Sequence, residues 1–385
     1  MVAVSSSRLS RRVESELMSD ATPDKLRVLM VSEAFGSGVY AYINQLCNAL
    51  CGEFEFYVLY SGARKETPKD CCERFDPRVR LIRFDGLSDL RDPVRIRSAV
   101  SEIRKVAEEV DPQVVHLHSS LAGALGRIAL RNSGYKVVYT PHGYSFILQG
   151  DCLKSRVYHL IEKALGKVDA VTLACCESEG EVAMSLTKSA TWIETGIDLD
   201  KFKYEASGIE VEKDRRFTVF TLGRICVQKQ PALFNRIAEL VPEANFVWIG
   251  DGELRGELTA KNLTVTGWKP REEALMLAKK ADAFVLCSLG EAVAMSLLEN
   301  MSLGKLILVS DVVGNKSVIR DGVNGYVCDT AEEYAVRIRR AMRDFPSELP
   351  AAALKDIETT YNLQVMARRF SKFYKELAGW GEQGS

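Results

Sequence analysis

Long apolar stretches are missing from this chain of 385 residues. No run of 18 or more apolar residues occurs, so the sequence predicts no helix that spans a bilayer. The first residues, MVAVSSSRLSRRVESELMSD, lack the apolar segment of a secretory signal. Residues 1–24 are instead expected to form a disordered extension. These absences favour a cytoplasmic protein.

An excess of charge of either sign is missing as well. The chain has 51 Lys and Arg against 52 Asp and Glu, which gives a net charge of -1. Nucleic-acid-binding proteins need a strongly basic face, so the sequence argues against a nucleic-acid partner. Only four histidines are present, and the ten cysteines include no C-x-x-C pair. The sequence therefore predicts no bound metal, and free thiols in a reducing compartment.

What the chain does contain is an alternation of short apolar runs with segments of helical periodicity, repeated in two halves. The alternation predicts the α/β class, with parallel sheets covered by helices on both faces. A chain of this length exceeds one typical core, so we expect two Rossmann-like domains, residues 25–200 and 201–360, facing across a cleft. A C-terminal helix within 361–385 is expected to pack at the domain junction. The predicted strands are residues 26–31, 56–60, 79–84, 114–117, 136–140, 170–173, 217–222, 245–249, 263–266, 283–287, 306–309 and 325–327.

The most informative segment is residues 289–304, LGEAVAMSLLENMSLG. It lies between two predicted strands, which places Glu291 in a loop and Glu299 in the second turn of a short helix. Ligands of open α/β sheets bind in loops at the carboxyl ends of the strands. A helix start can hold an anion on its free N–H groups, and carboxylates can bind hydroxyls. An anion beside a polyol suggests a nucleotide-sugar.

Two cations lie in the loop LGRICVQKQ that follows the first strand of the second half. The guanidinium of Arg224 and the ammonium of Lys229 together suit a pyrophosphate. Alone they would be two solvated loop cations, but the same cleft should also hold Glu291. We therefore interpret them as diphosphate ligands.

A glycine motif, Gly36-x-Gly38-x-x-Ala41, follows the first strand and resembles the dinucleotide fingerprint. Its first glycine lies about five residues beyond the strand, and the second strand ends without an acidic residue for a ribose. The motif is better explained as a loop that lets a substrate approach the backbone. Arg64 and Lys65 would suit a 2′-phosphate, so an NADP-dependent dehydrogenase stays open as an alternative.

Two histidines each come just past a predicted strand. His142, followed by Gly143, is interpreted as a substrate contact and His118 as a weaker candidate, although a strand-tip histidine can equally be a polar cap. Ser178 with Glu181 matches a helix capping box. Asp198-x-Asp200 has the spacing of a metal-binding motif, but in the linker it predicts a turn.

Taken together, these motifs resemble the retaining GT-B glycosyltransferases of family 4. The resemblance extends over about residues 26–377. It implies an acceptor-binding first domain and a donor-binding second domain. The residues that it implicates in catalysis are His142, Glu291, Arg224 and Lys229. Those that it places at the donor are Gly36, Gly38, Gly223, Gly250, Trp268, Val293, Ala294, Met295 and Glu299. On the acceptor side we expect His118 and Tyr144.

The resemblance also implies roles. Arg224 and Lys229 would hold the donor diphosphate and Glu299 the ribose. The loop before Trp268 would line the base, and the backbone of residues 293–295 would face the phosphate. One departure is Glu291-Ala-Val-Ala, where the family often has Glu-Gly-Phe-Gly. Because alanine lacks the positive-φ freedom of glycine, the loop path or the donor sugar is expected to differ.

The function implied is transfer of a sugar from a nucleotide diphosphate, UDP in preference to GDP, to a hydroxyl with retention and without a metal cofactor. The acceptor is expected to be a glycan or lipid-linked acceptor of bacterial surface-polysaccharide synthesis. A nucleotide-sugar epimerase and a silent binding protein remain alternatives beside the dehydrogenase.

Contact with the inner face of the membrane is a further expectation, since lysine and arginine near an anionic bilayer favour docking. Interspersed carboxylates offer a solvated face as the equal alternative. The cations are Arg74, Arg78, Arg80, Arg83, Arg91, Arg95, Arg97, Arg104 and Lys105, followed by Lys154, Arg156, Lys163 and Lys167.

Overall fold

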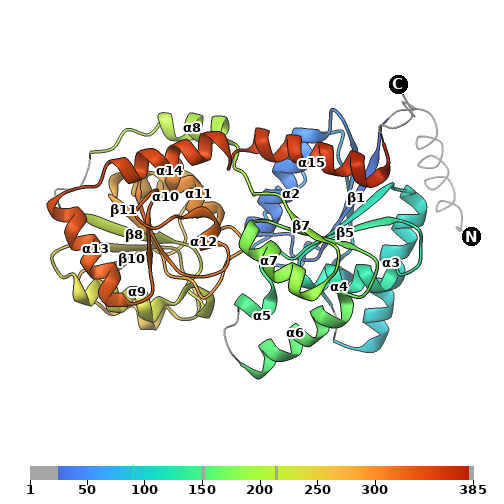
Figure 1. Cartoon of the computed structure of the whole chain (residues 1–385), viewed down its shortest axis with the longest axis horizontal. Coiled ribbons are helices and arrows are strands. Elements are labelled where there is room, and N and C mark those ends of the chain that lie inside the picture. Colours follow the sequence, from blue (N-terminus) through green and yellow to red (C-terminus); the bar gives the residue numbers. More distant parts are fainter. Residues whose placement is uncertain (1–24, 90, 149–151, 213–215, 381–385) are drawn as a thin grey trace, which may run out of the picture.

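A computed structural model describes residues 25–89, 91–148, 152–212 and 216–380 (Figure 1). The expected disordered extension, residues 1–24, lies outside the described residues. Two α/β units lie side by side, and the C-terminal part of the chain runs across both. The predicted class of two Rossmann-like domains is confirmed.

The N-terminal domain is built on a seven-stranded sheet in the order β3-β2-β1-β4-β5-β6-β7. All of its strand pairs are parallel, and β1 and β4 are buried almost throughout. Continuous apolar runs such as VLMV in β1 are what a strand covered on both faces requires. The strands are β1 Arg27–Ser32, β2 Glu55–Tyr60, β3 Arg80–Arg83, β4 Val114–His118, β5 Lys136–Thr140, β6 Val171–Ala174 and β7 Ala190–Trp192.

The C-terminal domain is built on a six-stranded parallel sheet in the order β10-β9-β8-β11-β12-β13. In both sheets the strand order changes direction beside the first strand, and this is where doubly wound folds bind ligands. The strands are β8 Thr218–Leu222, β9 Asn245–Ile249, β10 Leu263–Val265, β11 Ala283–Leu286, β12 Leu306–Ser310 and β13 Tyr326–Cys328.

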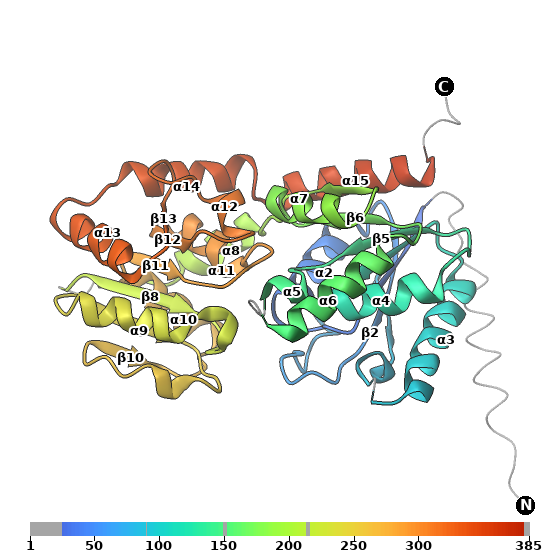
Figure 2. The ribbon, with the colours of Figure 1, turned by 60° about the horizontal axis from the view of Figure 1, so that its bottom comes forward.

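Helices cover both faces of each sheet (Figures 1 and 2). Those of the first domain are α2 Ser37–Leu50, α3 Pro93–Val110, α4 Ser120–Ala129, α5 Ser145–Leu148, α6 Leu153–Leu165 and α7 Glu177–Leu186, with a 3₁₀ turn η1 Asp85–Ser88. Those that follow are α8 Leu199–Ser207, α9 Pro231–Leu240, α10 Arg271–Lys280, α11 Met295–Ser302, α12 Asn315–Val318, α13 Ala331–Arg343, α14 Glu348–Thr359 and α15 Leu363–Ala378, with 3₁₀ turns η2 Val227–Lys229 and η3 Arg255–Glu257.

Each strand predicted from the sequence is present, with ends that differ by at most one residue. The strand that sequence reasoning missed is β7. It is only three residues long, lies at the sheet edge and is half-buried, so it leaves no apolar run in the sequence. No helix of the described segments is long and apolar enough to cross a membrane.

The C-terminal helix α15 differs from the expectation of packing at the domain junction. It begins there, where Ile197 and Asn362 form an isolated bridge, and the Asn362 side chain caps it by accepting from Val365 N at 2.9 Å. The helix then runs along the N-terminal domain, where Phe370 and Tyr374 are fully buried in that domain's core (Figure 2). The apolar stripe of α15 is buried by packing against the core of the N-terminal domain, and the junction alone offers no comparable apolar surface.

Candidate functional site

A cleft of about 510 Å³ lies between the two domains. Its walls come from the loops that follow β1, β5, β8 and β11, so the carboxyl ends of strands from both sheets face it. The predicted residues that line it are Gly36, Gly38, His142, Gly223, Arg224, Lys229, Trp268, Glu291, Val293, Ala294 and Met295. Folding therefore brings most of the predicted site into one space.

The amino end of α11 forms the floor of this cleft. The first backbone bond of the helix runs from Leu297 N to Ala294 O at 2.9 Å, so the preceding amides have no partner within the helix. None of the described non-glycine residues with positive φ lies in the loop of Ala292 and Ala294. Alanine at positions 292 and 294 is thus compatible with the loop conformation. The backbone amides at the start of α11 stay free of partners within the helix. This is an arrangement that binds an anion.

Lys229 is held at the same place by an ion pair. Its Nζ lies 2.5 Å from Glu291 Oε1, and the two side chains are 18% and 9% exposed. Arg224 is more exposed, and its Nη1 lies 3.4 Å from Glu66 Oε1, a carboxylate of the opposite domain. The two cations and the α11 amino end therefore lie on one side of the cleft, with a carboxylate beside each cation.

Two glycines allow the loop of Arg224 and Lys229, which follows β8, to pack against the loop after β9. Gly223 and Gly250 have φ values of 142° and 143°, in the region that favours glycine. A Cβ at Gly250 would lie 2.1 Å from the carbonyl oxygen of Gly223. The absence of a side chain at Gly250 therefore lets the loop after β8 pack closely against it. Gly250 itself lines a second, smaller pocket and not the cleft.

His142 is the predicted catalytic histidine, and the structure places it at the cleft in a strained conformation, with φ of 54°. Its Nε2 lies 2.9 Å from His118 Nδ1, and its Nδ1 lies 3.5 Å from the Cys175 thiol. Burial lowers the pKa of His142 to about 3. The imidazole is therefore neutral at physiological pH.

Glu179 holds the loop of His142 in place, and sequence reasoning missed it. This fully buried carboxylate accepts from Gly143 N at 2.7 Å and from Cys175 N at 2.8 Å. Burial raises its pKa, while the two backbone donors oppose that shift. Glu179 joins the loops after β5 and β6 and so fixes the backbone of His142.

The structure does not bring His118 and Tyr144, predicted on the acceptor side, to the surface of the cleft. His118 is fully buried between His142 and Met30, whose Sδ lies 3.2 Å from His118 Nε2. Tyr144 is also buried, and its ring packs against that of Phe146 at 5.1 Å. Neither side chain lines the cleft. The Tyr42 ring of α2 packs against His118 at a centroid distance of 6.0 Å, and α15 covers the same face of β4 at His116.

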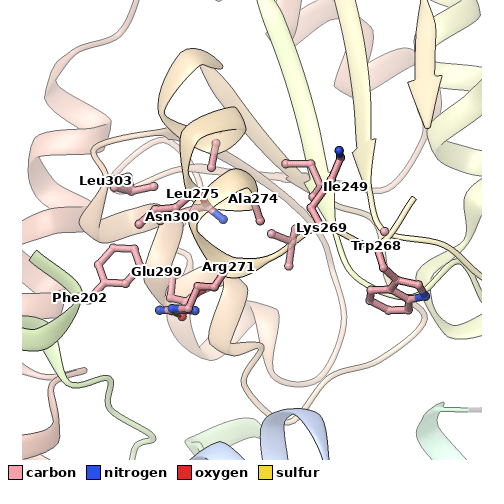
Figure 3. A pocket seen from close by; sticks show the side chains of 13 residues that line it. Phe202, Ile249, Trp268, Lys269, Arg271, Ala274, Leu275, Glu299, Asn300 and Leu303 are labelled. Carbon is pink, nitrogen blue, oxygen red and sulfur yellow. Dashed lines mark hydrogen bonds and ion pairs between the residues drawn. The ribbon is translucent and has the colours of Figure 1, made fainter. Parts of the chain in front are cut away.

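A second pocket, of about 240 Å³, adjoins the cleft at Trp268, which lines both (Figure 3). Glu299 points into it beside Arg271, whose Nη2 lies 3.0 Å from Glu299 Oε1. Burial raises the pKa of Glu299, and the arginine opposes that shift. Arg271, which also pairs with Glu205 at 2.7 Å, was not identified from the sequence. Predicted Gly250 and Glu299 line this pocket, whose walls are otherwise mainly apolar.

Direct contacts fix the two domains beside the cleft. Ser178, expected in a capping box, instead accepts from Gly314 N at 2.9 Å and from Ser317 Oγ at 2.7 Å of the opposite domain. The α7 N-cap residue, Cys176, makes no side-chain cap bond and contacts Ala292 O at 3.2 Å. The capping-box interpretation is therefore wrong, because these side chains serve the domain contact.

The two linker aspartates have structural partners. Asp198 Oδ1 caps α8 by accepting from Lys201 N at 3.1 Å, and Asp200 Oδ2 accepts from Gln364 at 3.2 Å. Neither lines the cleft that contains Arg224 and Lys229. Within the described ranges, no three histidine, cysteine, aspartate or glutamate residues cluster as metal ligands.

Two family descriptions match the chain, one on each domain. Residues 36–201 match Glycosyltransferase Family 4, and residues 216–344 match Glycosyl transferases group 1. Both descriptions are of glycosyltransferases, and together they match most of the two domains. The two facing parallel-sheet domains of the chain are the GT-B fold.

Relatives of this glycosyltransferase act in bacterial surface-polysaccharide synthesis. It is 30% identical over 262 residues to the UDP-Gal:alpha-D-GlcNAc-diphosphoundecaprenol alpha-1,3-galactosyltransferase of Escherichia coli. That match covers 61% of the chain and 66% of the relative, slightly less than two thirds of its length. A putative teichuronic acid biosynthesis glycosyltransferase, TuaC of Bacillus subtilis, is 27% identical over 234 residues, which are 58% of the chain and 59% of the relative.

Solved structures confirm the fold of the glycosyltransferase. Sucrose-phosphate synthase of Thermosynechococcus elongatus superposes with a TM-score of 0.78 at 15% identity, over 92% of this chain and 100% of that one. Anabaena HepE, solved in complex with UDP and glucose, has a TM-score of 0.74 at 14% identity, over 91% and 100% of the two chains. At these identities the likeness concerns the fold alone.

Proposed function

We propose that this glycosyltransferase moves a sugar from a UDP-sugar to a hydroxyl of a lipid-linked glycan, with retention of the anomeric configuration. The observation that carries the donor half is the convergence of Lys229, Arg224 and the amino end of α11 on one cleft. Beside it lies a pocket with a carboxylate, Glu299. A diphosphate in the cleft and a nucleoside in the pocket would complete one ligand.

The leaving diphosphate gains negative charge as the sugar–phosphate bond breaks, and fixed positive groups stabilise it. The Lys229 ammonium lies against Glu291, 2.5 Å away. A bound diphosphate would share that ammonium, and Glu291 would then face the sugar. Neutral His142 would act by hydrogen bonding, not as a cation. Among the described residues, the partner of its Nδ1 is the Cys175 thiol, a weak hydrogen-bonding group that a sugar hydroxyl can displace.

The nucleoside would occupy the pocket of Figure 3, with the base between Trp268 and the apolar wall and the ribose on Glu299. UDP is proposed in preference to GDP because the Escherichia coli relative is named for UDP-Gal and HepE was solved with UDP. The match of residues 36–201 to Glycosyltransferase Family 4, together with the resemblance to its retaining members, supports retention. The protein's own cations would carry the diphosphate charge, so the proposed reaction needs no metal.

The acceptor is proposed from the same relative, whose name gives a GlcNAc-diphosphoundecaprenol acceptor. Such an acceptor is held in a bilayer, so the enzyme would work at the inner face of the membrane. The acceptor glycan would approach the cleft from the N-terminal domain, beside Gly36 and Gly38.

The test is product analysis with radiolabelled UDP-sugars, GDP-sugars and a polyprenyl-linked acceptor, with and without EDTA. Transfer of label from a UDP-sugar to the lipid, unaffected by EDTA, supports the proposal. An altered sugar still attached to the nucleotide would identify an epimerase, and oxidation that depends on NADP a dehydrogenase. Loss of transfer in EDTA with recovery on adding manganese would contradict the proposed role of Lys229 and Arg224.

A further inference from the structure

Helix α6 of the N-terminal domain has the reverse of the usual polarity. Its protein-facing side holds Ser155 and Glu162, both buried. Its large apolar side chains are exposed instead: Leu153 at 79%, Val157 at 47%, Leu160 at 66% and Ile161 at 44%. A helix on the surface of a globular protein normally directs its apolar stripe to the core.

The exposed residues form one stripe, because positions 153, 157, 160 and 161 recur with the helical period. The buried polar side chains fix this orientation. Arg127 Nη2 and Tyr139 Oη each donate to the Glu162 carboxylate at 2.8 Å, and Ser155 Oγ donates to Phe146 O at 2.5 Å. Rotation of α6 to bury the stripe would break these bonds and expose a buried ion pair. The apolar stripe therefore faces outward as a built feature.

Positive charge accompanies the stripe. Lys154, Lys163 and Lys167 are exposed, and no carboxylate of the described residues forms an ion pair with them. The only carboxylate of α6, Glu162, is the buried one. A second copy of the chain docked symmetrically on this stripe would bring lysines against lysines. An anionic surface with an apolar interior complements both the stripe and its lysines.

We propose that α6 is the surface by which the protein docks on an anionic lipid bilayer. The stripe would enter the boundary between headgroups and acyl chains, and the lysines would lie on the lipid phosphates. The place of α6 in the fold suits this role, since it forms an outer edge of the N-terminal domain next to α5 (Figures 1 and 2). In α5, Leu148 lines the cleft, and Phe146 packs against His159 of α6 at 4.9 Å. Docking would thus place the cleft beside the membrane. That this position serves the reaction rests on the proposed lipid-linked acceptor.

The cations that the sequence suggested first are less suitable. Five arginines of that cluster are ion-paired with neighbouring aspartates: Arg74 with Asp70, Arg78 with Asp76, Arg83 with Asp85, Arg91 with Asp89 and Arg95 with Asp92. Paired in this way, they present a mixed face to an anionic membrane. The structure therefore moves the expected membrane contact from this cluster to α6.

The experiment is sedimentation of the full chain with vesicles of phosphatidylglycerol and phosphatidylcholine, or of phosphatidylcholine alone, without donor or acceptor. The wild type should pellet with the anionic vesicles at low salt and less at high salt. Leu153→Glu/Leu160→Glu should weaken binding by more than about tenfold, through lost apolar burial and added repulsion. The matched control adds two carboxylates at exposed apolar positions far from α6, Tyr204→Glu/Val336→Glu (82% and 63% exposed), and should bind like the wild type.

Several results would overturn the proposal. They are no pelleting of the wild type with anionic vesicles, equal binding of the α6 variant and its control, and a wild-type dimer in sedimentation velocity that the α6 variant dissociates. A greater loss in Arg95→Glu/Arg97→Glu than in the α6 variant would also overturn it. Stabilisation of each variant by UDP checks its fold. Transfer to a water-soluble acceptor, retained by the α6 variant, separates failure of docking from failure of the proposed function.

Discussion

The buried ion pair between Lys229 and Glu291 makes a quantitative prediction about stability and donor binding. With side chains only 18% and 9% exposed, it is buried enough that removal of one partner leaves an uncompensated charge. Breaking a buried pair costs about 3–5 kcal/mol. Because Lys229 keeps some exposure, we expect Lys229→Met to lower the free energy of unfolding by about 3 kcal/mol, the lower end of that range.

The double variant Lys229→Met/Glu291→Gln separates the two roles of the lysine. Removing both charges leaves no buried ion, so its stability should return to within about 1 kcal/mol of the wild type. It should nevertheless fail to respond to UDP. At a concentration of about 100 times Kd, UDP should stabilise the wild type by about 2.7 kcal/mol and neither variant by a comparable amount.

The assay is urea unfolding with and without UDP. Lys203→Met is the control, since Lys203 pairs with Glu358 at 3.0 Å but both side chains are about half exposed. Its stability should change by less than about 1 kcal/mol, and its response to UDP should be intact. A Lys229→Met variant as stable as the wild type would refute the buried pair. A double variant that UDP still stabilises fully would refute the diphosphate role of Lys229.

Three further predictions concern positioning and pH. Glu179→Gln should lower kcat for transfer by about tenfold or more with little change in KM, because one of its two backbone donors loses its acceptor and the His142 loop shifts; an unchanged kcat would exclude this role. Arg271→Ala should raise KM for the UDP-sugar more at pH 6 than at pH 8, since burial already raises the pKa of Glu299 and its cation would be gone; an increase independent of pH would contradict this. Burial lowers the pKa of His118 well below its usual 6.5, so the unfolded state binds more protons and stability should fall as pH drops below about 6.5. His118→Asn should reduce the slope of the free energy of unfolding against pH by up to about 1.4 kcal/mol per pH unit. Denaturant unfolding at several pH values measures this slope, and a slope equal to that of the wild type would contradict the prediction.

Local patterns predicted the fold well, and they identified residues that the structure brings to one cleft and its adjoining pocket. Strands buried on both faces leave continuous apolar runs, so the core strands could be located within one residue. Arg224, Lys229, Glu291 and Glu299 follow strands whose carboxyl ends share one edge, and parallel topology alone brings them together. Motif spacing therefore carried real information about that half of the cleft.

The errors concern contacts between distant parts of the chain. His118 seemed accessible because it ends a strand, but α15 covers that face, where Tyr374 lies 2.7 Å from His116 although the two are 258 positions apart. Glu179 looked like an ordinary residue in the first turn of a helix, whereas its partner at Gly143 lies 36 positions away. No local period encodes such pairings.

The central claim is that one cleft holds the diphosphate of a UDP-sugar. The most direct measurement is the electron density of a crystal soaked with UDP. We predict the two phosphates between Lys229, Arg224 and the amides at the start of α11, the ribose hydroxyls on Glu299, and the uracil beside Trp268. UDP bound elsewhere, or held in the cleft with its phosphates pointing away from Lys229 and α11, would contradict the account.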